Sequence, residues 1–408
     1  MSDPTSTALS HLTSMSNLHP DLASQYSALS DLYSKKLWHQ FTVSSLSFLS
    51  DPSTLRPDND GASSHLAFFQ QVVLPIDSKL NPLCLARMAS LVAFGLPDGT
   101  ETVLQPLLQS KAKLLGPAAA LYLTSRLGLL HLTLLAKSSS DLSSPTAIQT
   151  LEQVATYIES NRSNLEEIAN TECEAAIVHS AYYEMAMTYR KAVGPPEKYY
   201  NEAIQYVAYT NLTELSEATR HGLAVDLSLS ALTGEGVFNF GEIIASPVLQ
   251  ALRGSQEEYL VKLLECGSHG DVLGFASIAE AHSQQIALQP SLVSRSEAVK
   301  EKITLLALVN MVFERPSLER TLAFEDVASR VNVTIDQVEW VIMRALSLNL
   351  IKGTMDQCEQ SVDVTWVMPR VLNEVQMGEL AGRFGEWAVK VSRTRDYMLE
   401  HTGALLNQ

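Results

Sequence analysis

The sequence predicts a mainly α-helical protein, in which a right-handed α-solenoid of degenerate helical repeats precedes a winged helix and one long C-terminal helix. From Tyr26 to about Gln289, apolar residues recur at helical spacing between short breaks. Between Val299 and Trp366 the elements read as helix, strand, helix, helix and hairpin, which is the winged-helix order. From Val371 onward a heptad pattern predicts the last helix.

Composition sets the number of domains and narrows the class of partner. The chain has 408 residues, 46% of them hydrophobic, so it can bury a large core in more than one domain. Its formal net charge of -16 argues against nucleic acid or anionic lipid as the main partner. We divide it into a flexible tail (1–24), a helical-repeat solenoid (25–290), a winged helix (298–370) and a C-terminal helix (371–404).

The N-terminal stretch and the cysteines indicate the compartment. Met1 to Pro20 is rich in Ser and Thr and lacks the basic start and apolar centre of a signal peptide, so we interpret it as a flexible tail. The four cysteines are far apart, which favours a reducing compartment and gives no pattern for disulfides or zinc. They are Cys84, Cys173, Cys266 and Cys358.

One segment, Leu114 to Ala136, is apolar enough to raise the question of a membrane span. It contains Pro117, Arg126 and His131, and its apolar residues recur at helical spacing, so we interpret it as a buried helix. The sequence therefore predicts no membrane partner.

The repeat region is divided where the backbone chemistry requires it. Asn81 and Pro82 form a cap and first-turn pair, Gly116 and Pro117 form a turn, and a Gly-Pro-Pro run from Gly194 ends a long helix. Consecutive amphipathic helices with short connections favour a solenoid, although an irregular helical bundle remains an alternative because no fixed period is visible.

The most unusual stretch of the region is GEGVFNFGEIIASPVL, from Gly234 to Leu249. Its glycines fit neither a dinucleotide fingerprint nor a phosphate loop. We predict a structural turn in which Gly234 and Gly236 allow a sharp exit, Phe238 and Phe240 anchor the core, and Asn239 caps a short helix. A ligand site remains an alternative, since glycines also permit close approach to the backbone.

The predicted winged helix lacks the charge of a DNA reader. Asp336, Glu339 and Arg344 are the only charges on its third helix, which is therefore net acidic where a reader needs cations. Its last strand is expected to offer an exposed sheet edge to another protein chain. The interface residues predicted on that strand are Val362, Val364 and Trp366.

Large apolar residues follow alternating steps of three and four along the last helix, a narrow seam broken only by Thr394. Such a seam favours packing against helices of other chains, with folding back onto its own domain as the alternative. The predicted interface residues are Leu380, Phe384, Trp387, Val391 and Met398, and Met377 starts the same seam.

Residue patterns typical of catalysis are missing from the sequence. The histidines do not form metal-binding pairs, and Cys266 near His269 lacks the signature of a cysteine protease. We therefore predict no catalytic residue, no metal site and no cofactor.

Four motifs carry a family resemblance. A helical-repeat region followed by a winged helix resembles the PCI domain of the proteasome lid, the signalosome and a translation initiation factor complex. LYSKKLWHQ from Leu32, GEGVFNFGE from Gly234, LAFEDVA from Leu322 and WVMPRVL from Trp366 are similar to the family of the 26S proteasome non-ATPase regulatory subunit 13.

That resemblance implies a non-catalytic scaffold of the regulatory particle lid, in the cytoplasm and nucleus, that supports assembly and ubiquitin-dependent degradation. The implied partners are other lid subunits, contacted through their PCI domains and C-terminal helices in a hetero-oligomer, without nucleic acid. A PCI subunit of the signalosome or of the initiation factor complex, and a nucleic-acid-binding winged-helix factor, are the alternatives.

Overall fold

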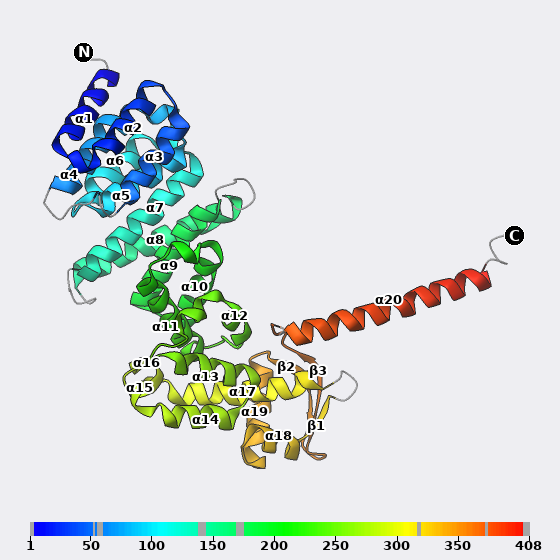
Figure 1. Ribbon diagram of the computed structural model, residues 1–408. Coiled ribbons are helices and arrows are strands. Elements are labelled where there is room, and N and C mark those ends of the chain that lie inside the picture. The colour runs from blue at the N-terminus through cyan, green and yellow to red at the C-terminus, as the bar shows by residue number, and fades with distance from the viewer. Residues whose placement is uncertain are drawn as a thin grey trace. The chain divides into compact units, whose positions relative to one another are not determined.

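Helices dominate the structure, a computed structural model that describes residues 4–51, 54, 60–137, 144–168, 175–315, 320–371 and 374–402 (Figure 1). The chain divides into two units, Met1–Leu215 and Ser216–Gln408. This boundary lies well before position 290, where we ended the repeat region, so the last helices of that region fold with the winged helix. Cys173, Leu372 and most of the predicted loop Ser138–Pro145 fall outside the described residues.

The first unit is a series of helices that pack in chain order. Its α-helices are α1 (Pro4–Leu18), α2 (Ala23–Ser34), α3 (Trp38–Ser50), α4 (Asp60–Phe68), α5 (Pro82–Phe94), α6 (Gln105–Ser110), α7 (Ala112–Lys137), α8 (Pro145–Ile168), α9 (Ala175–Val193) and α10 (Pro196–Tyr209). Short 3-10 or π turns lie at Pro20–Leu22, Phe69–Val73, Leu74–Lys79, Thr100–Leu104 and Leu212–Glu214. Helices contact partners close to them in sequence, such as α1 with α2 and α9 with α10, which is the arrangement of helical repeats.

The expectation of a flexible N-terminal tail was wrong for the described part of that segment. Residues Pro4–Leu18 form α1, which packs against α2. Ala8 and Leu12 are fully buried, and Met15 packs against the same core. These residues are three or four positions apart and so share one helical face, a pattern that the surrounding Ser and Thr residues obscured.

The apolar helix α7 packs within the first unit. Leu114–Lys137 is long and apolar enough to cross a membrane by length and composition, but 61% of its apolar window is buried among the other helices. The predicted turn is present inside it, since Gly116 has a φ of 68° and Pro117 follows. Arg126 on α7 bonds Glu184 on α9 at 2.8 Å, which joins alternate helices of the series.

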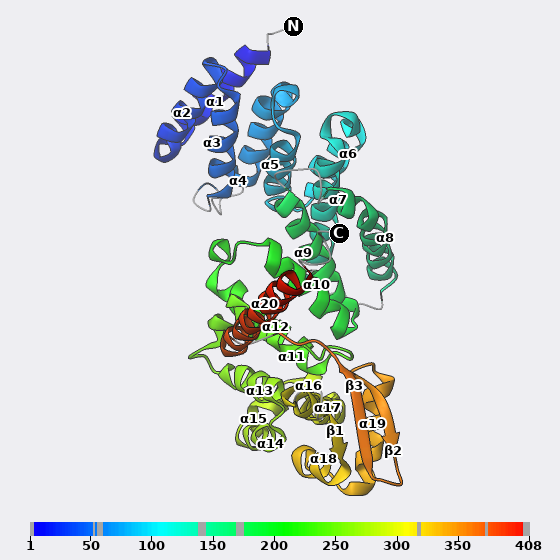
Figure 2. The ribbon, with the colours of Figure 1, turned by 90° about the vertical axis from the view of Figure 1, so that its right-hand side faces the viewer.

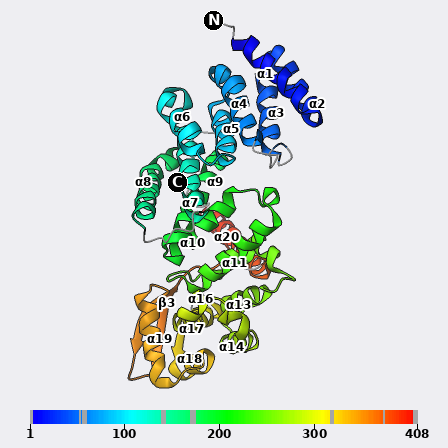
Figure 3. The same ribbon diagram turned by 90° about the vertical axis from the view of Figure 1, so that its left-hand side faces the viewer.

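The second unit continues with helices and ends in a small sheet and one long helix. Its elements are α11 (Glu217–Thr233), α12 (Phe240–Ala245), a 3-10 turn (Pro247–Leu252), α13 (Glu258–His269), α14 (Val272–Ala281), α15 (Ser283–Ala287), α16 (Pro290–Ser294), α17 (Ser296–Glu314), β1 (Thr321–Ala323), α18 (Phe324–Val331), α19 (Ile335–Ser347), β2 (Ile351–Asp356), β3 (Ser361–Val367) and α20 (Glu374–Thr402). Helix α17 lies between α13 and α14 on one side and α18 and α19 on the other (Figure 3).

The predicted order of helix, strand, helix, helix and hairpin is confirmed from α17 to β3. The three antiparallel strands have the order β1-β3-β2, and α17, α18 and α19 pack beside the sheet (Figure 2). The ladder between β2 and β3 shifts register between Lys352 and Gly353. A Cβ atom on Gly353 would collide with the carbonyl of Asp363, so this bulge requires glycine.

A buried lysine holds the predicted turn against α17. Lys302 is 6% exposed, and its Nζ donates hydrogen bonds to the carbonyls of Ala231 at 2.5 Å and Gly234 at 2.8 Å. The same Nζ lies 5.8 Å from the ring centroid of Phe238 and 5.0 Å from that of Phe240. Burial lowers the pKa of Lys302 to about 7. The end of α11 and the turn that follows it are therefore tied to one side chain.

We expect Lys302→Met to loosen this turn. Methionine keeps most of the side-chain volume but leaves two carbonyl oxygens without a donor. Each unsatisfied buried carbonyl lowers the stability of the turn by about 1–3 kcal/mol. The variant gains part of this back, because it no longer has to bury a cation. Hydrogen exchange of residues 231–241 should accelerate in the variant while that of residues 4–215 stays unchanged. If residues 231–241 of the variant exchange at the same rate as in the wild type, Lys302 does not hold this turn in place.

Acid should destabilise the first unit before the second. Burial lowers the pKa of His11, His65, His131 and His179, so at falling pH the unfolded chain takes up protons that the folded unit does not accept. This stability is complete above the unfolded pKa of about 6.5 and is lost as the pH falls below it. The protection factors of residues 4–215, which compare each amide's exchange with its intrinsic rate at the same pH, should fall from pH 7 to pH 5.5.

The matched control is His65→Phe with His179→Phe, which keeps the packing of His65 on Phe48 and of His179 on Tyr209. This variant should show a smaller change between the two pH values than the wild type. An equal change in both would show that other groups cause the acid sensitivity.

Candidate protein interface

The seam residues of α20 are exposed. Every residue from Met377 to Glu400 is exposed, and Phe384 and Trp387 have exposed fractions of 60% and 64%. Leu380, Val391 and Met398 are also among the exposed large apolar residues. Apolar groups of this size in one heptad row are typical of a helix whose partners come from another chain.

The predicted interface on β3 was wrong in its geometry. β3 is the central strand of the sheet, and its first half is bonded to β1 on one side and β2 on the other, so Val362 and Val364 do not form a free edge. Val362 and Val364 are buried and belong to the core. Trp366 is 39% exposed and Lys352 lies over its ring at 5.1 Å. The alternating pattern identified a strand with one buried face, but it could not specify the order of strands in the sheet.

The predicted turn after α11 is present, with different roles for its two glycines. Gly236 has a φ of 80°, which favours glycine, whereas Gly234 has an ordinary φ of -69° and ends α11. Phe238 and Phe240 are buried as predicted. Asn239 precedes α12 but its side chain makes no capping hydrogen bond, so that part of the prediction was wrong.

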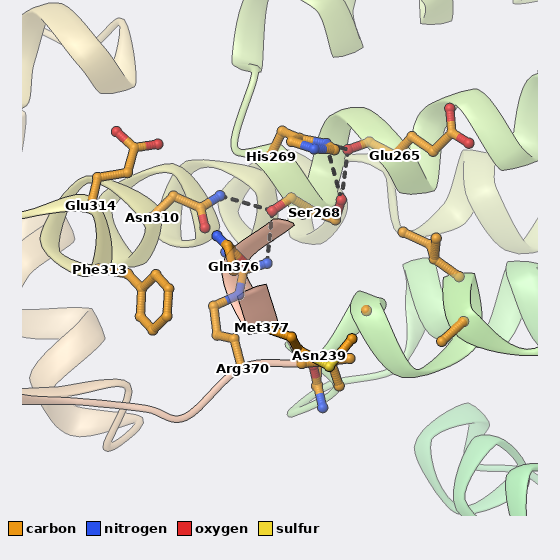
Figure 4. Close-up of a pocket in the computed structure, with 14 residues that line it drawn as sticks. Asn239, Glu265, Ser268, His269, Asn310, Phe313, Glu314, Arg370, Gln376 and Met377 are labelled. Carbon is orange, nitrogen blue, oxygen red and sulfur yellow. Dashed lines mark hydrogen bonds between the residues drawn. The ribbon is translucent and has the colours of Figure 1, made fainter. Parts of the chain in front are cut away.

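One carbonyl oxygen at the end of α13 accepts hydrogen bonds from two side chains. The Ser268 carbonyl accepts hydrogen bonds from Asn310 Nδ2 on α17 at 2.9 Å and from Arg370 Nη2, after β3, at 2.7 Å (Figure 4). Gly270 closes α13 with a φ of 66°, and a Cβ atom there would lie 2.7 Å from the Cα atom of Ala307. Elements far apart in sequence therefore meet at this helix end.

A cavity of about 570 Å³ lies beside this junction (Figure 4). Its walls come from α12, α13, α17, the segment after β3 and the first turn of α20. Phe313 and Met377 are among its apolar lining residues, and Arg370, His269 and Asn239 among its polar ones. Burial lowers the pKa of Arg370, and none of the ion pairs among the described residues supplies it with a carboxylate.

The sequence contained a signal that Lys302 and Asn310 have buried hydrogen-bond partners. Lys302 and Asn310 occupy positions on the face of α17 that is otherwise formed by apolar residues. A polar residue on such a face needs a buried partner, and that was the available signal. The role of Arg370 had no comparable signal, because its acceptor is 102 positions away in sequence.

The third helix of the winged helix is a poor surface for DNA. Arg344, its only cation, bonds Glu301 of α17 at 2.8 Å, and Glu339 accepts a hydrogen bond from Gln357. Trp340 is 73% exposed on this helix. An acidic face with its cation already paired cannot neutralise phosphates.

Metal and thiol chemistry find no support in the part of the chain that the structure describes. It contains no group of three or more His, Cys, Asp or Glu side chains that could hold a metal ion. Burial raises the pKa of Cys266, which keeps its sulfur a thiol, and His269 Nδ1 lies 2.8 Å from the Glu265 carbonyl within its own helix.

Comparison with known proteins gives the family. Residues 25–264 match the PSD13 N-terminal repeats and residues 279–366 match the PCI domain. The 26S proteasome non-ATPase regulatory subunit 13 homolog A of Arabidopsis thaliana is 31% identical over 395 residues, covering 95% of this chain and 96% of the relative. The 26S proteasome regulatory subunit RPN9 of Saccharomyces cerevisiae is 31% identical over 218 residues, covering 53% and 54%.

A partial likeness extends to the eukaryotic translation initiation factor 3 subunit M of Aspergillus oryzae, 28% identical over 214 residues, covering 52% of this chain and 44% of the relative. The likeness to subunit 13 is longer and includes both the repeats and the winged helix. The chain therefore belongs to the family of the 26S proteasome non-ATPase regulatory subunit 13.

Proposed function

We propose that this chain is a non-catalytic scaffold subunit of the 26S proteasome regulatory lid, in the cytoplasm and nucleus. It would support assembly of the lid, and through it ubiquitin-dependent degradation, by contacts of its PCI domain and of α20 with other lid subunits. Membership of the subunit 13 family across 95% of the chain supports this assignment.

The exposed seam of α20 carries the proposal. Phe384 and Trp387 each place more than half of their surface in water, together with the other apolar residues of the seam. Burying apolar surface stabilises an association by roughly 25 cal/mol per Å², so a row of aromatic and aliphatic side chains provides a strong driving force for packing against partner helices. Val362 and Val364 of β3 are buried and are not part of this interface.

We expect Phe384→Asp with Trp387→Asp to abolish incorporation into the lid. Two carboxylates in the centre of a helix–helix interface would have to lose their water without gaining a partner. The measurement is the fraction of tagged chain that migrates with the lid in native gels after co-expression. The variant should keep the helical content and thermal unfolding of the wild-type chain, because these side chains contact solvent.

The matched control is Val389→Asp with Leu399→Asp. Both residues are exposed on α20, at 51% and 61%, but lie outside the seam. This variant should incorporate like the wild type. Normal incorporation of the seam variant, or equal loss in both variants, would contradict a role of the seam.

Nucleic acid binding is the competing function, and the charge distribution predicts that it is absent. We expect duplex DNA to bind no more tightly than the ~10⁻⁴ M of weak nonspecific contacts, without a steep loss between low and high salt. Fluorescence anisotropy with labelled duplex at two salt concentrations measures both. Micromolar affinity that falls steeply with salt would favour the nucleic-acid-binding alternative.

A further inference from the structure

The cavity beside Ser268 and the seam of α20 form one continuous surface. Met377 is the first seam residue and also lines the cavity, and Gln376 lines it one position earlier. A helix that packs along the seam toward the N-terminal end of α20 therefore arrives at the mouth of the cavity. The volume of about 570 Å³ is within the roughly 300–1,000 Å³ of ligand pockets and accommodates large side chains.

The cavity contains an apolar wall and a cation. Phe313, Ile244 and Met377 provide apolar surface. Among the described residues, Arg370 donates one hydrogen bond, to the Ser268 carbonyl, whereas a guanidinium has five N–H donors. Two carboxylates line the cavity, those of Glu265 and Glu314. The Glu314 carboxylate pairs with Arg330 at 3.2 Å, and no ion pair among the described residues joins Glu265 or Glu314 to Arg370. A carboxylate from outside the chain would complete the pairing of Arg370.

We propose that this cavity receives the end of the partner helix that packs along α20, with an apolar side chain between Phe313 and Met377 and a carboxylate against Arg370. The inference rests on the proposed function, because it assumes that the seam packs against a helix of another lid subunit. The occupant is a protein segment that combines a large apolar residue with an Asp, a Glu or its own C-terminal carboxylate.

The first test fills the cavity without changing Arg370 or the seam. Ala245 is an exposed residue that lines the cavity, so Ala245→Trp blocks the space while the core stays intact. Ala276→Trp on α14 is the matched control, because it places the same side chain on an exposed alanine away from the cavity. When variant and wild type compete at equal dose, we expect Ala245→Trp to enter the lid about tenfold less often, and Ala276→Trp to match the wild type.

The second test identifies the occupant in the assembled lid. Photo-leucine at position 245, a compact diazirine side chain that leaves most of the cavity open, and benzoylphenylalanine at position 387 should crosslink to the same partner subunit. The peptide linked to position 245 should contain an acidic group and lie beyond the end of the segment linked to position 387. Links to two different subunits, or none from position 245 in lids that link at position 387, would overturn the proposal.

The two proposals fail in different ways. If Ala245→Trp enters the lid like Ala276→Trp while the Phe384→Asp and Trp387→Asp variant does not, the cavity has no role but the seam does. If the seam variant also incorporates normally, the proposed function of α20 fails with it.

Discussion

A buried lysine constrains the centre of the second unit. Lys302 is removed from water without a carboxylate partner in the described chain, and such a cation is tolerated only where fixed dipoles replace its hydration. The Ala231 and Gly234 carbonyls provide these dipoles, and two aromatic rings cover the same group. Two turns along α17, Asn310 donates to the end of α13 in the same way. These bonds fix α17 both along its axis and in rotation.

This constraint connects the end of the repeat region to the winged helix across position 290, where the sequence-based division lies. Helix α17 is the first helix of the winged helix, yet its polar side chains complete the ends of α11 and α13, which belong to the repeat region. Arg370, beyond the sheet, bonds the same Ser268 carbonyl as Asn310. The end of the repeats, the winged helix and the base of α20 are therefore one hydrogen-bonded assembly, and the unit boundary falls earlier, after Leu215.

Apolar residues have two roles in this assembly: some form its core, and others are exposed on α20. The strand that reads as alternating in sequence is internal, because Val362 and Val364 face the core from the middle of the sheet. The heptad row is external, because Phe384 and Trp387 have no covering element among the described residues. A scaffold needs this combination: a unit whose elements are joined by buried hydrogen bonds, and a separate helix whose apolar row is completed by another chain.

The sequence by itself determined the order of elements in the winged helix, the heptad row and the buried aromatics of the turn, because these depend on periodicity along the chain. It could not determine that α1 is part of the repeats, since its apolar positions are diluted by Ser and Thr. Only the tertiary structure decided that β3 is the central strand, that Lys302 and Arg370 bond distant carbonyls, and that a cavity opens at the base of α20. Strand order, the pairing of buried polar groups and the shape of a cavity depend on residues far apart in sequence, and local periodicity contains no information about which of them meet.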